Sequence, residues 1–362
     1  MRSEVFDMIG SLISSRAARL RLAAPALALA AAAALSGCAR KAAEAPAEPP
    51  KVAVFVPGLV SGSPIYEQLV AGAEKAVAEI PGASLKVVEA GFNQAEWQDK
   101  LSALAASGEF DLIVSSNPSI PELCKKAAAD FPKARFFVAD AWLPGAAGVH
   151  TVLYNQYEQG YLVGYLAGLV TTSSLPGANP ALKAGLVVAQ RYPTLDLLIE
   201  PGFAKGLSEA APGAVLESRT VGNWFDANKA AELASSLMDS GADVILPIAG
   251  GAGQGVVSAA KARGRYAVWF DGDGYGVAPG TVLGCAVLRQ DRLVYEKVKA
   301  LLSKGGESLY GKAEVVGAKE GYVDFDESGE AYKALPAAMR DSFSAVLARL
   351  RSGATAFPVS GL

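Results

Sequence analysis

Short apolar runs alternate with amphipathic stretches from Val52 onward, and no other feature constrains the possible folds of this chain as strongly. Such alternation is typical of βαβ units, in which helices cover the faces of a parallel sheet. In the first half we expect strands at 52–57, 84–90, 110–115 and 135–139, with helices at 64–79, 95–106 and 120–130. Ser63 and Pro64 favour the first helix, because Ser is a preferred N-cap and Pro a preferred first helical residue.

The same order of elements repeats in the second half. We expect strands at 184–189, 214–220, 243–248 and 266–270, with helices at 195–210, 227–240 and 254–262. A further strand follows Gly280, then a helix at 291–303, a β-like segment near 313–325 and a last helix near 330–350. Between the halves, Gly160, Gly164 and Gly168 recur every four residues, which predicts close packing on one helix face.

The repeated units predict an α/β fold with two doubly wound parallel-sheet lobes, for which a chain of 362 residues is long enough. We assign residues 51–153 and about 276–304 to the first lobe, and residues 154–275 and about 305–362 to the second. This division requires the chain to cross between the lobes at hinges more than once. Ligands of such sheets bind at the carboxyl ends of the strands, so we expect the functional site there.

The first residues have the layout of a signal peptide. An apolar run at 22–35 follows three arginines and is too short to span a bilayer as a permanent helix. The acidic residues at positions 4 and 7 are unusual in a basic leader, which leaves Met8 open as an alternative start.

The leader ends in Leu-Ser-Gly-Cys at 35–38, which resembles the lipobox of bacterial lipoproteins. We therefore predict a signal peptide at 1–37 and acylation of Cys38; an ordinary signal peptide with a chance cysteine is the alternative. Residues 38–50 are rich in Ala, Pro and Glu and predict a tether, since this composition cannot bury a core. Stable anchoring needs more than one lipid chain. Multiple acylation of Cys38 would hold the folded body at the outer face of a bacterial plasma membrane or in an outer-membrane leaflet.

Composition disfavours several functional classes. The 33 basic and 36 acidic residues provide no polycationic surface, so nucleic acid is not an expected partner. His150 is the single histidine, and neither a Cys/His cluster nor a Gly-x-Ser-x-Gly motif accompanies it, so we expect no metal site and no catalysis. Cys124 and Cys285 stand in apolar contexts, which favours buried free thiols over a disulfide.

Polar and aromatic residues gather where the expected strands end. They supply aromatic faces, carboxylates and amides, which together would suit a planar ring that carries hydroxyl groups. Asp140 and Asp271 are the stronger candidates, because an Asp at a parallel-strand end has few structural duties, whereas Asp226 alone is better explained as an N-cap. The candidate ligand-binding residues are Ser61, Tyr66, Asn117, Asp140, Trp142, Gln190, Tyr192, Trp224, Phe225, Asp226, Gly251, Gln254 and Asp271.

Several of these stretches resemble one known family. The runs VGNWFD at 221–226, GGAGQGV at 250–256, FDGD at 270–273 and EQGYLVG at 158–164 resemble the basic membrane protein family. Its members are substrate-binding lipoproteins of ABC transporters, best known as purine-nucleoside receptors. The resemblance implies a monomer with a type I periplasmic-binding-protein fold, no enzymatic activity and no cofactor. It also implies an ABC permease and its ATPase as partners.

The first lobe departs from the nucleoside receptors. Their opening loop carries an Asp-Lys-Ser-Phe-Asn segment, where this chain has PGLVSGSPIY at 57–66. Residues 54–58, 89–97, 115–118 and 223–226 resemble a riboflavin-binding branch of the family instead. The resemblance therefore implies riboflavin as the transported ligand, with a purine nucleoside as the alternative. A flavin-dependent sensor or enzyme is a third hypothesis, disfavoured because no acid–base pair or nucleophile site can be assembled.

Overall fold

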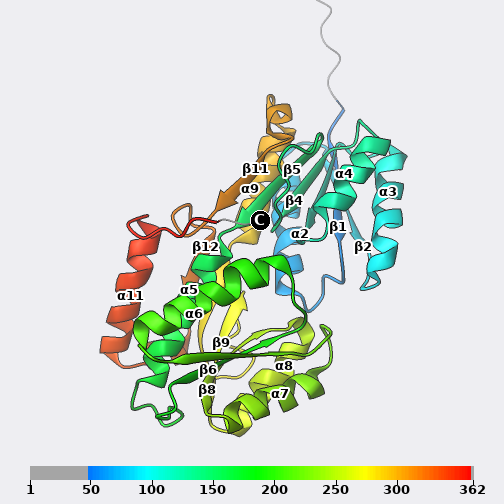
Figure 1. Cartoon of the computed structure of the whole chain (residues 1–362). Helices are drawn as coiled ribbons and strands as arrows, with labels where there is room; N and C mark the ends of the chain where they lie inside the picture. Colours follow the sequence, from blue (N-terminus) through cyan, green and yellow to red (C-terminus); the bar gives the residue numbers. More distant parts are fainter. Residues whose placement is uncertain (1–47, 360–362) are drawn as a thin grey trace, which may run out of the picture. The chain divides into compact units, whose positions relative to one another are not determined.

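The structure of the protein is a computed structural model that describes residues 48–359. The chain from Pro49 onward forms one compact unit. The expected signal peptide at 1–37, the lipidation site Cys38 and most of the tether lie outside the described residues. Figure 1 shows two sheets, each with helices on both faces.

The first sheet has the strand order β11-β5-β4-β3-β1-β2, and all its neighbouring strands are parallel. The strands are β1 (Lys51–Val56), β2 (Ser84–Glu89), β3 (Leu112–Ser116), β4 (Phe136–Ala139), β5 (Val149–Tyr154) and β11 (Ala313–Val316). Val52 and Val54 of β1 pack toward α2 (Pro64–Ala78) and α9 (Gln290–Leu302). Ala53 and Phe55 pack toward α3 (Trp97–Ser107) and α4 (Pro121–Asp130) on the other face. Successive strand side chains point to opposite faces, so a sheet covered on both sides is apolar at every position.

The second sheet has the order β12-β10-β9-β8-β6-β7, in which only β12 is antiparallel to its neighbour. Its strands are β6 (Lys183–Val188), β7 (Val215–Thr220), β8 (Ala242–Ile248), β9 (Tyr266–Asp271), β10 (Val282–Leu288) and β12 (Val323–Asp326). One face packs against α5 (Gln156–Thr171), α6 (Glu200–Ala210), α10 (Glu330–Lys333) and α11 (Ala337–Arg351). The other face packs against α7 (Ala227–Asp239) and α8 (Gly253–Ala262).

The expected fold class is confirmed, and most element boundaries agree within two residues. One difference concerns the expected helix at 195–210, which begins as a π-helical turn at Leu195–Ile199 before α6 starts at Glu200. Pro201 lies in the first turn of α6 and has no backbone N–H, so it cannot continue the preceding hydrogen-bond ladder.

The chain passes between the lobes three times: from β5 into α5, from β10 into α9, and from β11 into β12. This path differs from the expected division at two strands. We placed residues 276–304 in the first lobe, yet β10 pairs with β9 in the second sheet and only α9 packs on the first lobe. We placed residues 305–362 in the second lobe, yet β11 pairs with β5 in the first sheet. The partners of both strands are set by tertiary packing, which sequence periodicity does not encode.

The glycine stripe packs α5 directly against α6, as expected. A Cβ added at Gly160 would lie 2.4 Å from the carbonyl oxygen of Ile199, and one at Gly164 would lie 2.1 Å from that of Phe203. Gly206 of α6 is crowded in return, since its Cβ would lie 2.1 Å from the carbonyl oxygen of Tyr161. Because glycine has no side chain, the backbones of the two helices can make direct contact at these positions.

Candidate functional site

Two aspartates occupy equivalent places in the two lobes. Asp140 directly follows β4 in the first lobe, and Asp271 ends β9 in the second. Both have left-handed backbone, with φ of 53° for Asp140 and 70° for Asp271. This conformation is uncommon outside glycine, although Asp tolerates it better than most residues. The sharp turn it imposes ends each strand and positions the carboxylate at the carboxyl end of the sheet.

The two carboxyl groups interact across the lobes. Burial, together with the negative charge of Asp271, raises the pKa of Asp140 to about 7. Burial also raises the pKa of Asp271 to about 6, although a hydrogen bond from Gln159 works in the opposite direction. Oδ1 of Asp140 is buried without a hydrogen-bond partner among the described residues. The two carboxyl groups therefore ionise less readily than ordinary aspartates. A hydrogen-bond donor near them would favour the ionised form.

Tyr66 and Asn117 lie beside Asp140 in the first lobe. Nδ2 of Asn117 donates to the Tyr66 hydroxyl at 3.3 Å, and that hydroxyl donates to the carbonyl oxygen of Pro57 at 3.3 Å. Burial raises the pKa of Tyr66 to about 12, and the charge of Asp140 contributes in the same direction. Tyr66 is thus a neutral hydroxyl held close to the carboxylate of Asp140.

Tyr192 and Trp224 form an aromatic pair in the second lobe. Their ring centroids are 6.2 Å apart with planes inclined by 44°. Burial and the charges of Asp271 and Asp140 raise the pKa of Tyr192, which places this ring near both carboxylates. Trp224 remains 37 % exposed, so its ring has free surface. We call Tyr66, Asn117, Asp140, Tyr192, Trp224 and Asp271 the interlobe site.

The remaining candidates lie in strand-end loops or at the starts of the helices that follow them. Ser61, Gln190, Gly251 and Gln254 are exposed. Trp142 is 36 % exposed and Phe225 is 78 % exposed. Asp226 is the N-cap of α7, where its Oδ1 accepts from the backbone N–H of Lys229 at 3.0 Å, so its carboxylate already has a structural role.

Three glutamines near the site were not among the candidates: Gln159 and Gln290 lie in the first turns of the helices after two crossovers, and Gln68 lies in α2. Nε2 of Gln159 donates to Oδ1 of Asp271 at 3.1 Å. Nε2 of Gln68 in α2 donates to the carbonyl oxygen of Asp271 at 3.4 Å, which joins the two lobes. Gln159 lies within the EQGYLVG run that carries the family resemblance. It was not a candidate, because it lies in a helix and the candidates were sought at strand ends.

The chemistry of the site favours binding over catalysis. Within the described residues there is no group of three His, Cys, Asp or Glu that could hold a metal ion. His150 lies away from the site on β5, fully buried, with its Nδ1 3.1 Å from the carbonyl oxygen of Lys312 and its Nε2 3.4 Å from Glu314. Burial lowers the pKa of His150, which suits a structural role between β5 and β11. Cys124 and Cys285 are buried free thiols.

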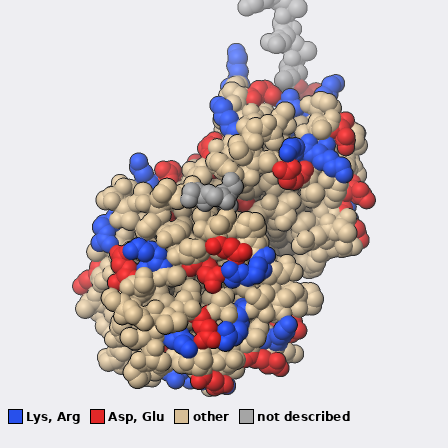
Figure 2. All heavy atoms as spheres, in the orientation of Figure 1, with Lys and Arg blue, Asp and Glu red and all other residues tan. Residues whose placement is uncertain are grey.

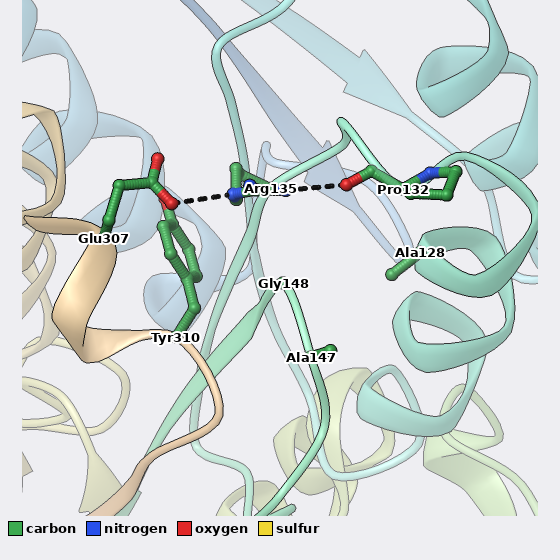
Figure 3. A pocket seen from close by; sticks show the side chains of 7 residues that line it. All are labelled: Ala128, Pro132, Arg135, Ala147, Gly148, Glu307 and Tyr310. Atoms are coloured by element: carbon green, nitrogen blue, oxygen red, sulfur yellow. Dashed lines mark hydrogen bonds and ion pairs between the residues drawn. The ribbon is translucent and has the colours of Figure 1, made fainter.

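Two surface pockets lie at the opposite, amino ends of the strands. One of about 180 Å³ lies in the first lobe, where Arg135 points between Glu307 and the carbonyl of Pro132 (Figure 3). Another of about 380 Å³ is lined by residues from Thr171 to Leu182, just before β6. Because ligands of parallel sheets bind at the carboxyl ends, neither pocket competes with the interlobe site.

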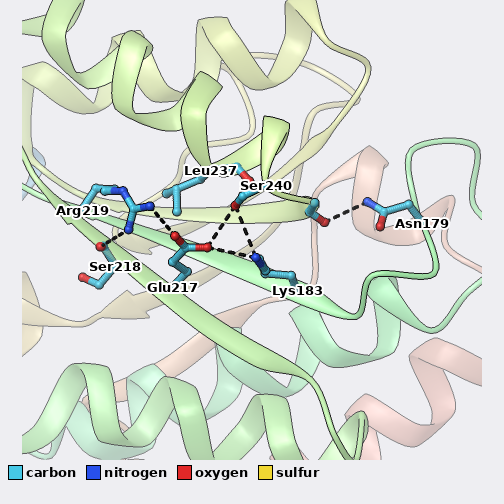
Figure 4. A network of polar contacts seen from close by, with 8 residues as sticks. Asn179, Lys183, Glu217, Ser218, Arg219, Leu237 and Ser240 are labelled. Atoms are coloured by element: carbon cyan, nitrogen blue, oxygen red, sulfur yellow. Dashed lines mark hydrogen bonds and ion pairs between the residues drawn. The ribbon is translucent and has the colours of Figure 1, made fainter.

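A polar network covers the outer edge of the second sheet (Figure 4). Glu217 of β7 accepts hydrogen bonds from Lys183 at 3.1 Å, from Ser240 at 3.0 Å and from Arg219. These bonds hold the pKa of Glu217 at about 2. Such charges protect an edge strand from pairing with other chains. Figure 2 shows basic and acidic side chains interspersed over the visible face.

Two α/β lobes whose strand ends share one polar and aromatic site define the fold of a bilobed solute-binding protein. The fold is similar to that of an ABC transporter solute-binding protein from Aeropyrum pernix K1, with a TM-score of 0.74 and 21% identity over 86% of this chain and 94% of that one. A transcriptional activator of the comK gene from Bacillus halodurans is also similar, with a TM-score of 0.66 and 20% identity over 84% of this chain and 99% of that one. Likeness at this level of identity concerns the fold alone.

Residues 50–341 match the family described as ABC transporter substrate-binding protein PnrA-like, and the chain belongs to this family. It is a family of substrate-binding proteins rather than enzymes, and the expected family is confirmed. Among curated relatives, the CD4+ T-cell-stimulating antigen of Listeria monocytogenes is 28% identical over 47% of this chain and 44% of its own length. The ABC transporter nucleoside-binding protein BmpA of Lactococcus lactis is 25% identical over 42% of this chain and 41% of its own. The chain thus matches less than half the length of these relatives.

Proposed function

We propose that the protein is the substrate-binding component of an ABC importer and that it captures riboflavin at the interlobe site. Membership of the substrate-binding family supports the transport role. The observation that carries the cargo proposal is the pair of partly buried carboxylates with raised pKa values, Asp140 and Asp271, contributed by different lobes. No described Lys or Arg lowers the pKa of either group, and Oδ1 of Asp140 has no hydrogen-bond donor among the described residues.

A polyhydroxylated, uncharged ligand satisfies these carboxylates. Hydroxyl groups donate to carboxylate oxygens, and hydrogen bonds to a charged acceptor are stronger than neutral ones. The ribityl chain of riboflavin carries several such hydroxyls. A phosphate group near the same carboxylates would add charge repulsion, so FMN should be rejected. Because Asp140 and Asp271 belong to different lobes, a ligand that bonds both stabilises the closed arrangement over the open one.

The aromatic pair suits the other end of riboflavin. Trp224 and Tyr192 stand near the carboxylates and offer flat surfaces to a ring system. Stacking on one aromatic side chain is worth about 1–3 kcal/mol in single-strand nucleic-acid binding, a comparable contact. The isoalloxazine ring would contact this pair while the ribityl chain reaches toward Asp140.

A purine nucleoside is the second candidate, and the Lactococcus lactis relative named for nucleoside binding favours it. Ribose hydroxyls and a purine ring would use the same carboxylates and the same aromatic pair. The two cargoes differ in the length of the polyol and in the area of the ring. Direct titration therefore separates them.

The proposal extends to the location of the protein. None of the helices at 48–359 is long and apolar enough to cross a bilayer. We propose that acylation of Cys38 keeps the two lobes at the extracytoplasmic face of the membrane, next to the permease. The tether at 38–50 would separate the folded body from the lipid surface.

Calorimetric titration of the full chain with riboflavin, FMN, inosine and adenosine tests the proposal. We expect riboflavin to bind with a Kd tighter than about 10 μM, with quenched flavin fluorescence and at least about tenfold discrimination against FMN. If inosine or adenosine binds and riboflavin does not, the ligand is a purine nucleoside. Failure of all four ligands would overturn both cargo assignments.

A further inference from the structure

Gln159 is fully buried in the first turn of α5, where the chain has just left the first lobe. Its Nε2 donates to Oδ1 of Asp271 at 3.1 Å and to the carbonyl oxygen of Ala286 in β10 at 3.1 Å. Both amide hydrogens are therefore used. The opposite amide orientation would place Oε1 against two acceptors, so the two bonds determine which way the side chain points.

The backbone of Asp271 is held from the other lobe by a second glutamine. Nε2 of Gln68 donates to the Asp271 carbonyl at 3.4 Å, while its Oε1 accepts from the backbone N–H of Gln290 at 3.0 Å. Gln290 begins α9 at the second crossover, where its own Nε2 donates to the carbonyl oxygen of Ile65 at 2.6 Å. Asp271 is thus held through its side chain by Gln159 at the first crossover and through its main chain by Gln68 of the first lobe.

We propose that Gln159 is a positioning residue of the interlobe site, which fixes the carboxylate of Asp271 and connects it to the first crossover. The inference rests on the proposed ligand role of Asp271. A hydrogen bond to a charged acceptor is worth more than one to a neutral acceptor, so the contact is strongest when Asp271 is ionised. Any movement of α5 relative to β9 at this crossover must strain or break the bond.

The charge of Asp271 gives the proposal a distinctive signature. Asp271 has a pKa of about 6, so its carboxylate is ionised at pH 8 and mostly protonated at pH 5. The titratable groups that face it are Asp140, Tyr154 and Tyr192. Both tyrosines have raised pKa values and stay neutral over this interval, and Asp140 is present in every variant compared. A role for Gln159 through Asp271 therefore depends on pH, whereas a packing role does not.

The test is Gln159→Met, which keeps the length of the side chain and removes its donor. Gln156→Met is the matched control, because Gln156 lies one turn earlier, is 4 % exposed and makes no side-chain hydrogen bond among the described residues. We expect Gln159→Met to lower the Tm of the ligand-free protein more at pH 8 than at pH 5. In the D271N background that difference should disappear. Gln156→Met should show no such pH dependence.

A second measurement uses riboflavin and inosine as probes. Whichever probe binds the unaltered protein should bind Gln159→Met about tenfold more weakly at pH 8, the usual scale for one hydrogen bond to a charged group. If neither probe binds, the cargo proposal fails while the Tm comparison still decides the role of Gln159. Equal Tm losses at both pH values in both backgrounds, or an equal loss of binding in Gln156→Met, would overturn the inference.

Discussion

Asp140→Asn should stabilise the ligand-free protein above neutral pH while weakening ligand binding. Asn keeps the size of the side chain and also tolerates the left-handed backbone at φ 53°, so the change removes charge with little strain. The substitution eliminates a buried negative charge that burial and Asp271 both disfavour. A ligand-binding carboxylate is commonly retained at a cost in stability, and this variant measures that cost.

The size of the effect follows from the pKa of Asp140, which rises from an ordinary 3.8 to about 7. A carboxyl whose folded pKa exceeds its unfolded value binds more protons when folded, so the stability from this group is full below about pH 4 and lost as pH rises to about 7. At about 1.4 kcal/mol per pKa unit, the loss has an upper limit of about 4 kcal/mol. Asp140→Asn should recover about 2–4 kcal/mol at pH 8 and almost none at pH 4.

Chemical denaturation at pH 4, 6 and 8 measures this directly. Asp226→Asn is a suitable control, because it makes the same chemical change at the N-cap of α7, where Asn and Asp are nearly equivalent. We expect the control to change the free energy of unfolding by less than about 0.5 kcal/mol. The electrostatic reasoning is refuted if Asp140→Asn gives the same change at pH 4 and pH 8, or if it destabilises the protein at pH 8.

Three further variants test other parts of the molecule. Trp224→Ala should weaken riboflavin or nucleoside binding by about 1–3 kcal/mol in calorimetry, with some loss of Tm because Trp224 is only 37 % exposed; full affinity would remove Trp224 from the site. Gly164→Ala should lower the free energy of unfolding by about 1–3 kcal/mol, since its Cβ would lie 2.1 Å from the carbonyl oxygen of Phe203. Gly276→Ala is its control, because a Cβ there meets nothing within 4 Å. Cys38→Ala should abolish labelling by a fatty-acid analogue and release the protein from membranes, and a loss of ligand binding in this variant would contradict the tether.

Periodicity predicted the elements of the fold well. The strands at 52–57 and 243–248 are buried along nearly their whole length, and their apolar runs made them visible in the sequence. The partners of β10 and β11 could not be predicted, because the residue pattern of a strand does not specify which sheet the strand joins. Strand pairing joins residues that are far apart in the sequence, so local patterns do not predict it.

The strand-end positions of some candidate residues could also be predicted from the sequence. Asp140 and Asp271 follow strands, so the strand-end rule identified them from sequence. Gln159 was not predicted as a site residue, because α5 is buried on nearly all sides. On such a helix the hydrophobic periodicity does not single out a polar residue. Only the structure distinguished the aromatic candidates from one another: Tyr192 pairs with Trp224, whereas Phe225 is 78 % exposed.

The sequence by itself determined the two α/β lobes, the glycine face of α5 and the strand-end positions of Asp140 and Asp271. These features depend on residue type and on spacing along a few neighbouring turns or strands. Only the tertiary structure decided that Asp140 and Asp271 influence each other, and that Gln159 and Gln68 hold Asp271. Those contacts join residues more than one hundred positions apart, and only the three passages of the chain between the lobes bring them together.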